Sequence, residues 1–185
     1  GHEAGFEAMV ILLSSLSQKP IDIVSLFVWS THNWKRTTAE VSGFRSLVQS
    51  RTEPLLELAS AHDISFRIVY TETSHFSSHE LASLRNLEEQ TNTHKGLVCN
   101  LCCSYSGHEE LRRAATLGPI QENLLIPDPV DLFIRTSEQR LSDFLLWQSA
   151  FAEIYFWDGL FPSFTPDDFE GIWTWWKERE RRFGQ

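Results

Sequence analysis

The run IDIVSLFVW, residues 21–29, is almost entirely apolar and is rich in the β-branched and aromatic residues that favour strands. Three further runs have the same character: residues 65–71, 97–104 and 130–135. Strands that are apolar on both faces are typical of parallel sheets, which helices cover. These four runs therefore predict a central, mostly parallel sheet.

Segments with helical periodicity separate the predicted strands. They span residues 39–61, 78–91 and 108–115, and residues 8–16 precede the first strand. Helices in these places supply the crossovers that parallel strands require. Pro54 should divide the first of these segments into two helices, because a proline inside a helix loses a hydrogen bond and clashes with the preceding turn. We expect an α/β fold, with one domain over residues 1–185 and a parallel sheet flanked by helices.

A last helical segment near the C-terminus carries apolar side chains on one face. They are Phe169, Ile172, Trp173, Trp176 and Phe183. A stripe at this spacing is typical of a helix that packs on a core or on another subunit. We therefore expect core or a subunit interface here rather than a cofactor site.

The composition is that of a globular protein, because 42% of the 185 residues are hydrophobic and 22% are charged. Lys and Arg number 16 against 25 Asp and Glu, so the net charge is −9. This balance provides no general attraction to nucleic acid, and no nucleic-acid partner is expected. No apolar run approaches the roughly 20 residues of a membrane-spanning helix. An anionic ligand would need a local cluster of cations.

Three cysteines, Cys99, Cys102 and Cys103, lie within five positions of one another. Such clustering is no framework for a disulfide-rich secreted fold, so it favours a reducing compartment and a cytoplasmic location. Cys99 and Cys102 have the spacing of half a zinc site, but no second ligand pair follows at a matching distance. We interpret them as small hydrophobic residues of a buried strand.

Polar and cationic side chains follow two of the predicted strands, at the strand ends where ligands bind in open parallel sheets. The residues of interest are Ser30, Asn33, Trp34 and Arg36 after the first strand, and Arg135, Arg140 and Ser142 after the fourth. Guanidinium and hydroxyl groups suit phosphate or diphosphate. Two other interpretations stay open: a turn capped by Ser or Asn in the first group, and arginines paired with acids in the second.

Glu153 is the lone carboxylate of the apolar run AFAEIYF, residues 150–156. A buried carboxylate requires a cation, a metal or a proton as its partner. Mg²⁺ carrying a diphosphate would serve, because this ion takes one or two carboxylates together with phosphate oxygens. An ion pair with a nearby Arg or His is the alternative.

Several segments resemble motifs of the cis-prenyltransferases, which are the undecaprenyl and dehydrodolichyl diphosphate synthases. The segment RTSEQRLSDFLLWQ (135–148), with AEIYF (152–156) and ERRFG (180–184), looks like the C-terminal signature of this family. Three other blocks are similar to family motifs: WSTHNWKRT (29–37) to Phe-Ser-x-Glu-Asn-Trp-x-Arg-Pro, GHEAG (1–5) to Gly-His-x-x-Gly, and residues 100–111 to Asn-x-Ala-x-x-Tyr-Gly-Gly-Arg-x-Glu-Ile. The blocks follow the family order over nearly the whole chain.

The resemblance implies a fold and an activity. The fold would be that of the cis-prenyltransferases. The reaction would condense isopentenyl diphosphate with an allylic diphosphate, with Mg²⁺ as cofactor, and would form a cis-prenyl diphosphate. The enzyme would act as a homodimer, and peripheral association with a membrane stays open. Two rivals are a divergent member that couples or cyclises allylic diphosphates to a short terpenoid, and a non-catalytic subunit of a heteromeric enzyme.

The resemblance also implies a role for each matched residue. The residues that would hold isopentenyl diphosphate are Arg135, Arg140 and Ser142. Glu153 would bind the metal, and His2 would lie near the allylic diphosphate. Arg182 and Gly184 match an Arg-x-Gly element that completes the site across the dimer. The residues that would position substrate and support proton removal are Ser30, Asn33, Trp34 and Arg36.

The sequence also departs from the family pattern. The Met-Asp-Gly-Asn-x-Arg block, whose Asp is the main magnesium-diphosphate ligand, would precede Gly1, and the start without a methionine indicates trimming. Glu138 directly follows Ser137, so the phosphate loop is one residue shorter than in the family. The residues that replace the family's Glu, Pro, Gly and Arg are His32, Thr37, Ser106 and His108, in that order.

Overall fold

The computed structural model describes residues 2–180, without the side chain of His2. The chain divides into two compact units, Gly1–Ser106 and Gly107–Gln185. The expectation of a single domain over the whole chain stays a prediction.

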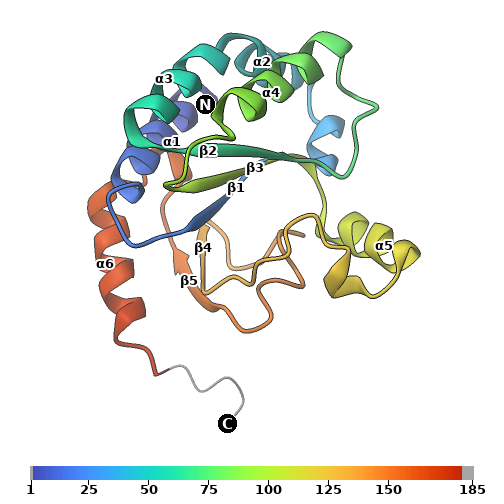
Figure 1. Cartoon of the computed structure of the whole chain (residues 1–185). Coiled ribbons are helices and arrows are strands. Elements are labelled where there is room, and N and C mark those ends of the chain that lie inside the picture. The colour runs from blue at the N-terminus through green and yellow to red at the C-terminus, as the bar shows by residue number, and fades with distance from the viewer. Residues whose placement is uncertain (1, 181–185) are drawn as a thin grey trace. The chain divides into compact units, whose positions relative to one another are not determined.

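The first unit contains a parallel sheet of three strands in the order β1-β3-β2 (Figure 1). Their bounds are Ile23–Ser30 for β1, Ser65–Val69 for β2 and Val98–Tyr105 for β3. Both outer strands run parallel to β3, and Ile23 of β1 and Ser65 of β2 share Val98 as their partner. This arrangement confirms the predicted α/β class and the parallel sheet.

The central strand β3 is the most buried of the three, because every residue after Val98 is inaccessible or nearly so. Cys99, Cys102 and Cys103 are free thiols inside this strand. Burial raises the pKa of the Cys103 thiol to about 12, so it stays protonated and unreactive at neutral pH. Among the described residues, no group of three or more His, Cys, Asp or Glu side chains could hold a metal ion. The interpretation of these cysteines as small core residues is confirmed.

Four helices accompany the sheet of the first unit: α1 (His2–Leu16), α2 (Thr38–Ser50), α3 (Thr52–His62) and α4 (Ser78–Thr91). Helices α2, α3 and α4 lie over the same face of the sheet (Figure 1). The predicted division at Pro54 is confirmed: the break falls at Arg51, which leaves Pro54 in the first turn of α3, where a proline is tolerated. Helix α1 begins six residues before the predicted segment.

The second unit pairs β4 (Leu132–Thr136) in parallel with β5 (Glu153–Trp157). It also contains α5 (Gly107–Leu117), α6 (Pro166–Lys177) and the 3₁₀ turns η2 (Ile120–Glu122) and η3 (Phe161–Ser163). The run at residues 130–135 was expected in one sheet with the other three, but in the described structure its partner is β5. Strand β5 was not predicted, although most of it lies in the apolar run at residues 150–156; in the structure its residues alternate between half-buried and exposed positions.

A buried carboxylate fixes the loops of the second unit. Glu110 of α5 is 1% exposed, and its Oε1 accepts hydrogen bonds from the backbone N–H groups of Leu125 (2.8 Å) and Ile126 (3.2 Å). Its Oε2 accepts a bond from Gln148 Nε2 at 3.1 Å. One acid thereby joins α5 to the two segments on either side of β4.

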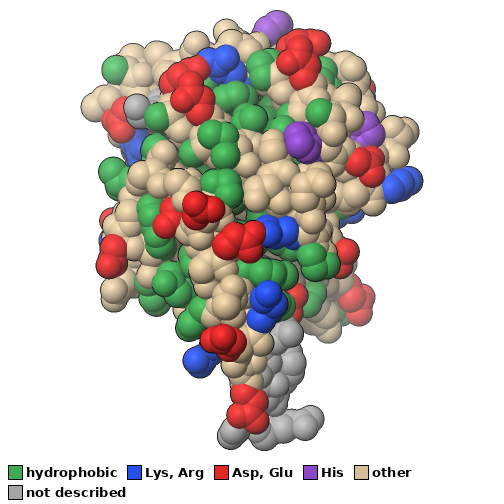
Figure 2. Space-filling model, turned by 90° about the vertical axis from the view of Figure 1, so that its left-hand side faces the viewer, with side chains coloured by type: hydrophobic (Ala, Val, Ile, Leu, Met, Phe, Trp, Pro, Cys, Tyr) green, Lys and Arg blue, Asp and Glu red, His purple; other side chains and the backbone are tan. Residues whose placement is uncertain are grey.

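The aromatic face of α6 is partly core. Phe169 and Ile172 are buried, and the rings of Trp173 and Trp176 stack with their centres 4.9 Å apart. The core interpretation is confirmed for the two buried residues, whereas Phe183 lies outside the described residues. Among the described helices, none combines the length and the apolarity needed to cross a membrane. On the face shown in Figure 2, acidic side chains are scattered, with basic ones between them.

Candidate active site

The first candidate group follows β1 and begins with a capped turn. Ser30 ends β1 and caps the 3₁₀ helix η1, Thr31–Lys35. The Oγ of Ser30 accepts a bond from the Asn33 N–H (3.2 Å), and the Ser30 N–H donates to Asn33 Oδ1 (2.9 Å). This reciprocal pair is a capping box, so the interpretation as a turn capped by Ser is correct for these two side chains. The Asn33 amide nitrogen is not part of the box.

Trp34 ties this turn to the neighbouring strand. Its indole N–H donates to Ser104 Oγ at 2.8 Å. Ser104 is fully buried near the carboxyl end of β3 and has a φ of 56°, a conformation that few residues other than Gly, Asn and Asp adopt readily. The Trp34 ring also makes edge contacts with Phe44 and Phe76, at centre distances of 5.6 and 5.2 Å. The sheet's carboxyl edge and the aromatic core together fix this residue.

Arg36 is the cation of the first group and caps the end of η1. Its side chain is 50% exposed, lies 3.6 Å from Glu40 and stands 5.8 Å from the ring centre of Trp29. An exposed ion pair of this length contributes little free energy. The guanidinium can therefore exchange Glu40 for an anionic ligand at small cost.

The second candidate group surrounds one carboxylate that the sequence analysis did not select. Arg135, on β4, donates to Glu138, and Arg140 Nη2 donates to Glu138 Oε1 at 2.7 Å. Arg140 Nε also donates to Ser142 Oγ at 3.2 Å. The structure thus brings the three predicted phosphate ligands together. The guanidinium groups of the two arginines are paired with an acid, which is the alternative interpretation given in the sequence analysis. The only local signal for Glu138 was its place in the shortened loop.

The backbone of this loop is strained. Ser137, Ser142 and Asp143 have φ values of 64°, 53° and 64°, in the left-handed region that costs non-glycine residues roughly 1–2 kcal/mol each. Asp143 anchors the loop to α5: its backbone oxygen accepts a bond from the Gly107 N–H, and its Oδ1 accepts one from the His108 N–H, both at 2.8 Å. The His108 ring nitrogen lies 2.6 Å from the same Oδ1. These contacts hold the loop in a geometry that its sequence does not favour.

Glu153, the predicted metal ligand, is less isolated than expected. Its side chain is 25% exposed, and Oε2 lies 3.3 Å from Arg179 Nε. The carboxylate is half-buried rather than fully buried, and its partner is an arginine just after α6, as the ion-pair alternative predicted. In the β4–β5 register Glu153 faces Leu132, whereas Arg135 faces Phe156 three positions further along. The carboxylate and the arginine loop therefore lie near opposite ends of the strand pair, about 10 Å apart along it.

Three of the predicted site residues have no described side chain. His2 begins α1, and its side chain lies outside the described part of the chain. Arg182 and Gly184 also lie outside the described residues. Of the predicted site residues with described side chains, Ser30, Asn33, Trp34 and Arg36 belong to the first unit, and Arg135, Arg140, Ser142 and Glu153 belong to the second.

A comparison with protein families matches residues 1–184 to a family described as putative undecaprenyl diphosphate synthase. The chain is 34% identical to the ditrans,polycis-undecaprenyl-diphosphate synthase ((2E,6E)-farnesyl-diphosphate specific) of Salmonella typhi, over 100% of the chain and 81% of that protein. The enzyme of the same name from Escherichia coli strain K12 is 33% identical, over 100% of the chain and 80% of that protein.

Two solved structures are similar along the whole chain. The structure of a probable undecaprenyl diphosphate synthase from Campylobacter jejuni has a TM-score of 0.90 and 32% identity, and the match covers 94% of that chain. Lavandulyl diphosphate synthase from Lavandula x intermedia, in complex with dimethylallyl diphosphate, has a TM-score of 0.92 and 26% identity, with 88% of that chain covered.

Proposed function

This chain belongs to the undecaprenyl diphosphate synthase family and is a prenyltransferase that condenses isopentenyl diphosphate with an allylic diphosphate, and we propose that its allylic substrate is farnesyl diphosphate. The curated relatives, at 33–34% identity, are named as farnesyl-diphosphate specific, which supports this primer. The observation that carries the assignment to a site is the cluster of Arg135, Arg140 and Ser142 at the end of β4.

We propose that this cluster binds the diphosphate of isopentenyl diphosphate. Two guanidinium groups and a hydroxyl provide several donors to phosphate oxygens, and guanidinium binds phosphate in a bidentate manner. The Glu138 carboxylate holds both guanidinium groups close together. An incoming diphosphate, with more charge than a carboxylate, takes over these pairs as it binds.

The reaction develops charge that fixed cations and amides can stabilise. The C–O bond of the allylic diphosphate breaks, a C–C bond forms to the isopentenyl unit, and a proton leaves to give the cis double bond. Diphosphate departs as an anion, so preorganised donors lower the barrier. We propose that the first group acts on this step: Arg36 and the Asn33 amide lie at the sheet's carboxyl edge, held by the capping box and by Trp34.

We also propose Mg²⁺ as cofactor, with Glu153 as its ligand in the described chain. A single carboxylate fits the preference of Mg²⁺ for one or two carboxylates together with phosphate oxygens and water. The neighbouring Arg179 is half exposed and pairs with Glu153 at 3.3 Å, so the carboxylate can leave it at low cost. When bound, the ion would neutralise charge on the diphosphate.

A homodimer is the proposed assembly. Ile154 and Phe156 share one face of β5 and are 36% and 40% exposed. Three large apolar side chains before and after this strand are exposed as well: Trp147, Phe151 and Leu160. Exposed apolar side chains in such number mark an interaction surface, and a second copy of the chain would cover it. The Arg182 and Gly184 element would then complete the partner's site.

A cytoplasmic location stays a proposal, supported by three free thiols in one strand. Peripheral association with a membrane is proposed from the product, since a long polyprenyl chain partitions into lipid. The short-terpenoid alternative is not favoured, because the curated relatives named above are chain-elongating synthases.

Replacing Arg140 tests the proposed substrate site. In Arg140→Ala, the apparent KM for isopentenyl diphosphate should rise about tenfold or more, which corresponds to about 1.4 kcal/mol of lost binding. Steady-state kinetics of the full-length protein, with farnesyl diphosphate held saturating, measures it. Arg113→Ala, which removes an exposed arginine of α5, is the control and should leave this KM unchanged. An unaltered KM in Arg140→Ala would reject the assignment.

A further inference from the structure

Arg45, on α2, connects three segments of the first unit around the Trp34 ring. Its Nη1 donates to Glu80 Oε2 at 2.5 Å, and its Nη2 donates to the backbone oxygen of His75 at 2.5 Å. The guanidinium carbon stands 5.2 Å from the centre of the Trp34 ring. One side chain thus contacts η1, the loop before α4 and α4 itself.

Glu80 makes this connection rigid. It is 1% exposed, and the Oε2 that binds Arg45 also accepts a bond from the Ser77 N–H at 2.7 Å, in the capping box of α4. Burial alone would raise the pKa of Glu80, but hydrogen bonds from Ser77 and Arg45 hold the pKa below its ordinary value. Glu80 is therefore a buried anion at neutral pH, and the described cation beside it is Arg45.

The loop before α4 contacts the same indole. The His75 ring stacks on Trp34, with centres 5.2 Å apart and planes inclined by 23°. Arg45 binds the His75 backbone and also lies over Trp34, so it joins the two segments that carry the stacked rings. A neutral side chain at position 45 would remove one contact from each of them, while the contacts of Trp34 with Ser104, Phe44 and Phe76 remain.

The turn that carries Trp34 needs such support. Helix η1 has five residues, and none of them is fully buried. It therefore has little packing of its own, and its position depends on the contacts of its side chains. Trp34 makes the most extensive of these, with Ser104, His75 and Arg45. Whatever fixes the Trp34 ring also fixes the segment from Ser30 to Arg36.

We propose that Arg45 is a positioning residue for the condensation: with Glu80 and His75 it holds Trp34, and through Trp34 it orients the catalytic segment at residues 30–36. The inference rests on the proposed function of that segment. It assigns no contact between Arg45 and substrate.

The effect should appear in turnover rather than in binding of isopentenyl diphosphate. A misplacement of about 1 Å in a reacting group can cost on the order of 100-fold in rate. We expect kcat of Arg45→Met to fall about tenfold or more. The apparent KM for isopentenyl diphosphate should change less than about twofold, because its proposed ligands belong to the second unit.

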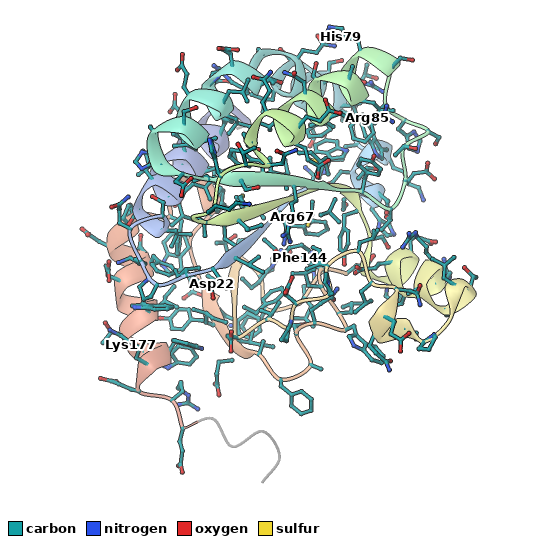
Figure 3. The ribbon with its side chains drawn as sticks, viewed as in Figure 1. Asp22, Arg67, His79, Arg85, Phe144 and Lys177 are labelled. Carbon is teal, nitrogen blue, oxygen red and sulfur yellow. The ribbon has the colours of Figure 1, made fainter. Side chains whose placement is uncertain are left out.

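Three further variants make the test specific. Arg45→Lys keeps a cation for Glu80, but it lacks the planar guanidinium whose two terminal nitrogens bind Glu80 and His75 while the plane covers Trp34, so Tm should stay near that of the wild type while kcat stays low. In a Trp34→Phe background, Arg45→Met should cost little further turnover, because the two residues act as one unit. Arg85→Met is the control: Arg85 is an exposed arginine on α4, the helix that also carries Glu80 (Figure 3).

The outcomes separate this inference from the proposed function. A wild-type protein that forms no elongated product contradicts the proposed function and the inference with it. An active wild type whose Arg45→Met variant keeps its kcat contradicts the inference alone. So does a full recovery of kcat in Arg45→Lys, which would reduce the role of Arg45 to a counter-charge for Glu80. If Arg45→Met does not fold, the lysine variant decides.

Discussion

Glu138 is the counter-ion of both arginines to which we assign the diphosphate. Its side chain is 42% exposed, and it binds Arg135 and Arg140 from the same short loop. Without a carboxylate between them, two neighbouring guanidinium groups repel each other. Glu138 therefore stabilises the empty loop and competes with the substrate for the same donors.

Removing the charge of Glu138 should favour the substrate. We expect Glu138→Gln to lower the apparent KM for isopentenyl diphosphate by about two- to tenfold, because the diphosphate no longer displaces a carboxylate. Steady-state kinetics at low and moderate salt measures this. Glu122→Gln, at an exposed position of η2, is the charge-matched control. A higher KM would show that Glu138 orients the arginines rather than competing for them.

At the residue scale, site residues could be associated from the sequence where they are close to one another along the chain. Arg135, Arg140 and Ser142 lie within eight positions, so local reading was enough to associate them. The partner of Glu153 was not predictable in this way, because Arg179 is 26 positions later. Arg45 and Glu80 are 35 positions apart, and neither stands in a motif. Contacts between residues so far apart in the sequence depend on how helices pack, and the local sequence pattern does not predict that packing.

Side-chain capping boxes begin α2, α4 and α6, and α6 is an example. Thr165 caps α6 through a hydrogen bond from the Asp168 N–H at 3.2 Å, and Asp168 Oδ2 accepts bonds from the Thr165 hydroxyl (2.6 Å) and N–H (2.9 Å). These bonds hold the pKa of Asp168 below its ordinary value. The lower pKa in the folded state means that the ionised carboxylate contributes stability.

That contribution should depend on pH with a definite sign. It is present above the unfolded-state pKa of about 3.9 and is lost as the pH falls through the lower pKa of the folded state. We expect Asp168→Asn to lower Tm at pH 7 and to approach the wild type at pH 3. Asp167→Asn, one position earlier in the same first turn, is the control for helix-dipole effects. A Tm difference for Asp168→Asn that is equal at both pH values would contradict the assignment.

At the element scale, periodicity predicted the helices well and the strands in part. The segment at residues 78–91 coincides with α4, and the proline rule placed the boundary between α2 and α3. Strand β5 was not predicted, although most of it lies in the apolar run at residues 150–156. Its exposed face, Ile154 and Phe156, is apolar, so the run lacks the polar alternation typical of a strand with one exposed face. An exposed apolar face of this kind is what the proposed dimer interface requires.

The proposed dimer has a direct functional consequence. If Arg182 completes the partner's site, an Arg140→Ala protein and an Arg182→Ala protein each lack a different part of it. After mixing and exchange, half of the dimers should be mixed and carry one intact site, which restores about a quarter of the wild-type activity. The assay follows activity against mixing time. No recovery, with exchange of copies verified by mass, would contradict a site shared between two copies.

The whole molecule condenses an allylic diphosphate with isopentenyl diphosphate, so its product should lengthen by isoprene units. The most direct test incubates the full-length protein and Mg²⁺ with farnesyl diphosphate, with and without isopentenyl diphosphate, and determines product masses. Products should grow in five-carbon steps only when isopentenyl diphosphate is present. Product from an allylic diphosphate alone, or no product with either mixture, would contradict it.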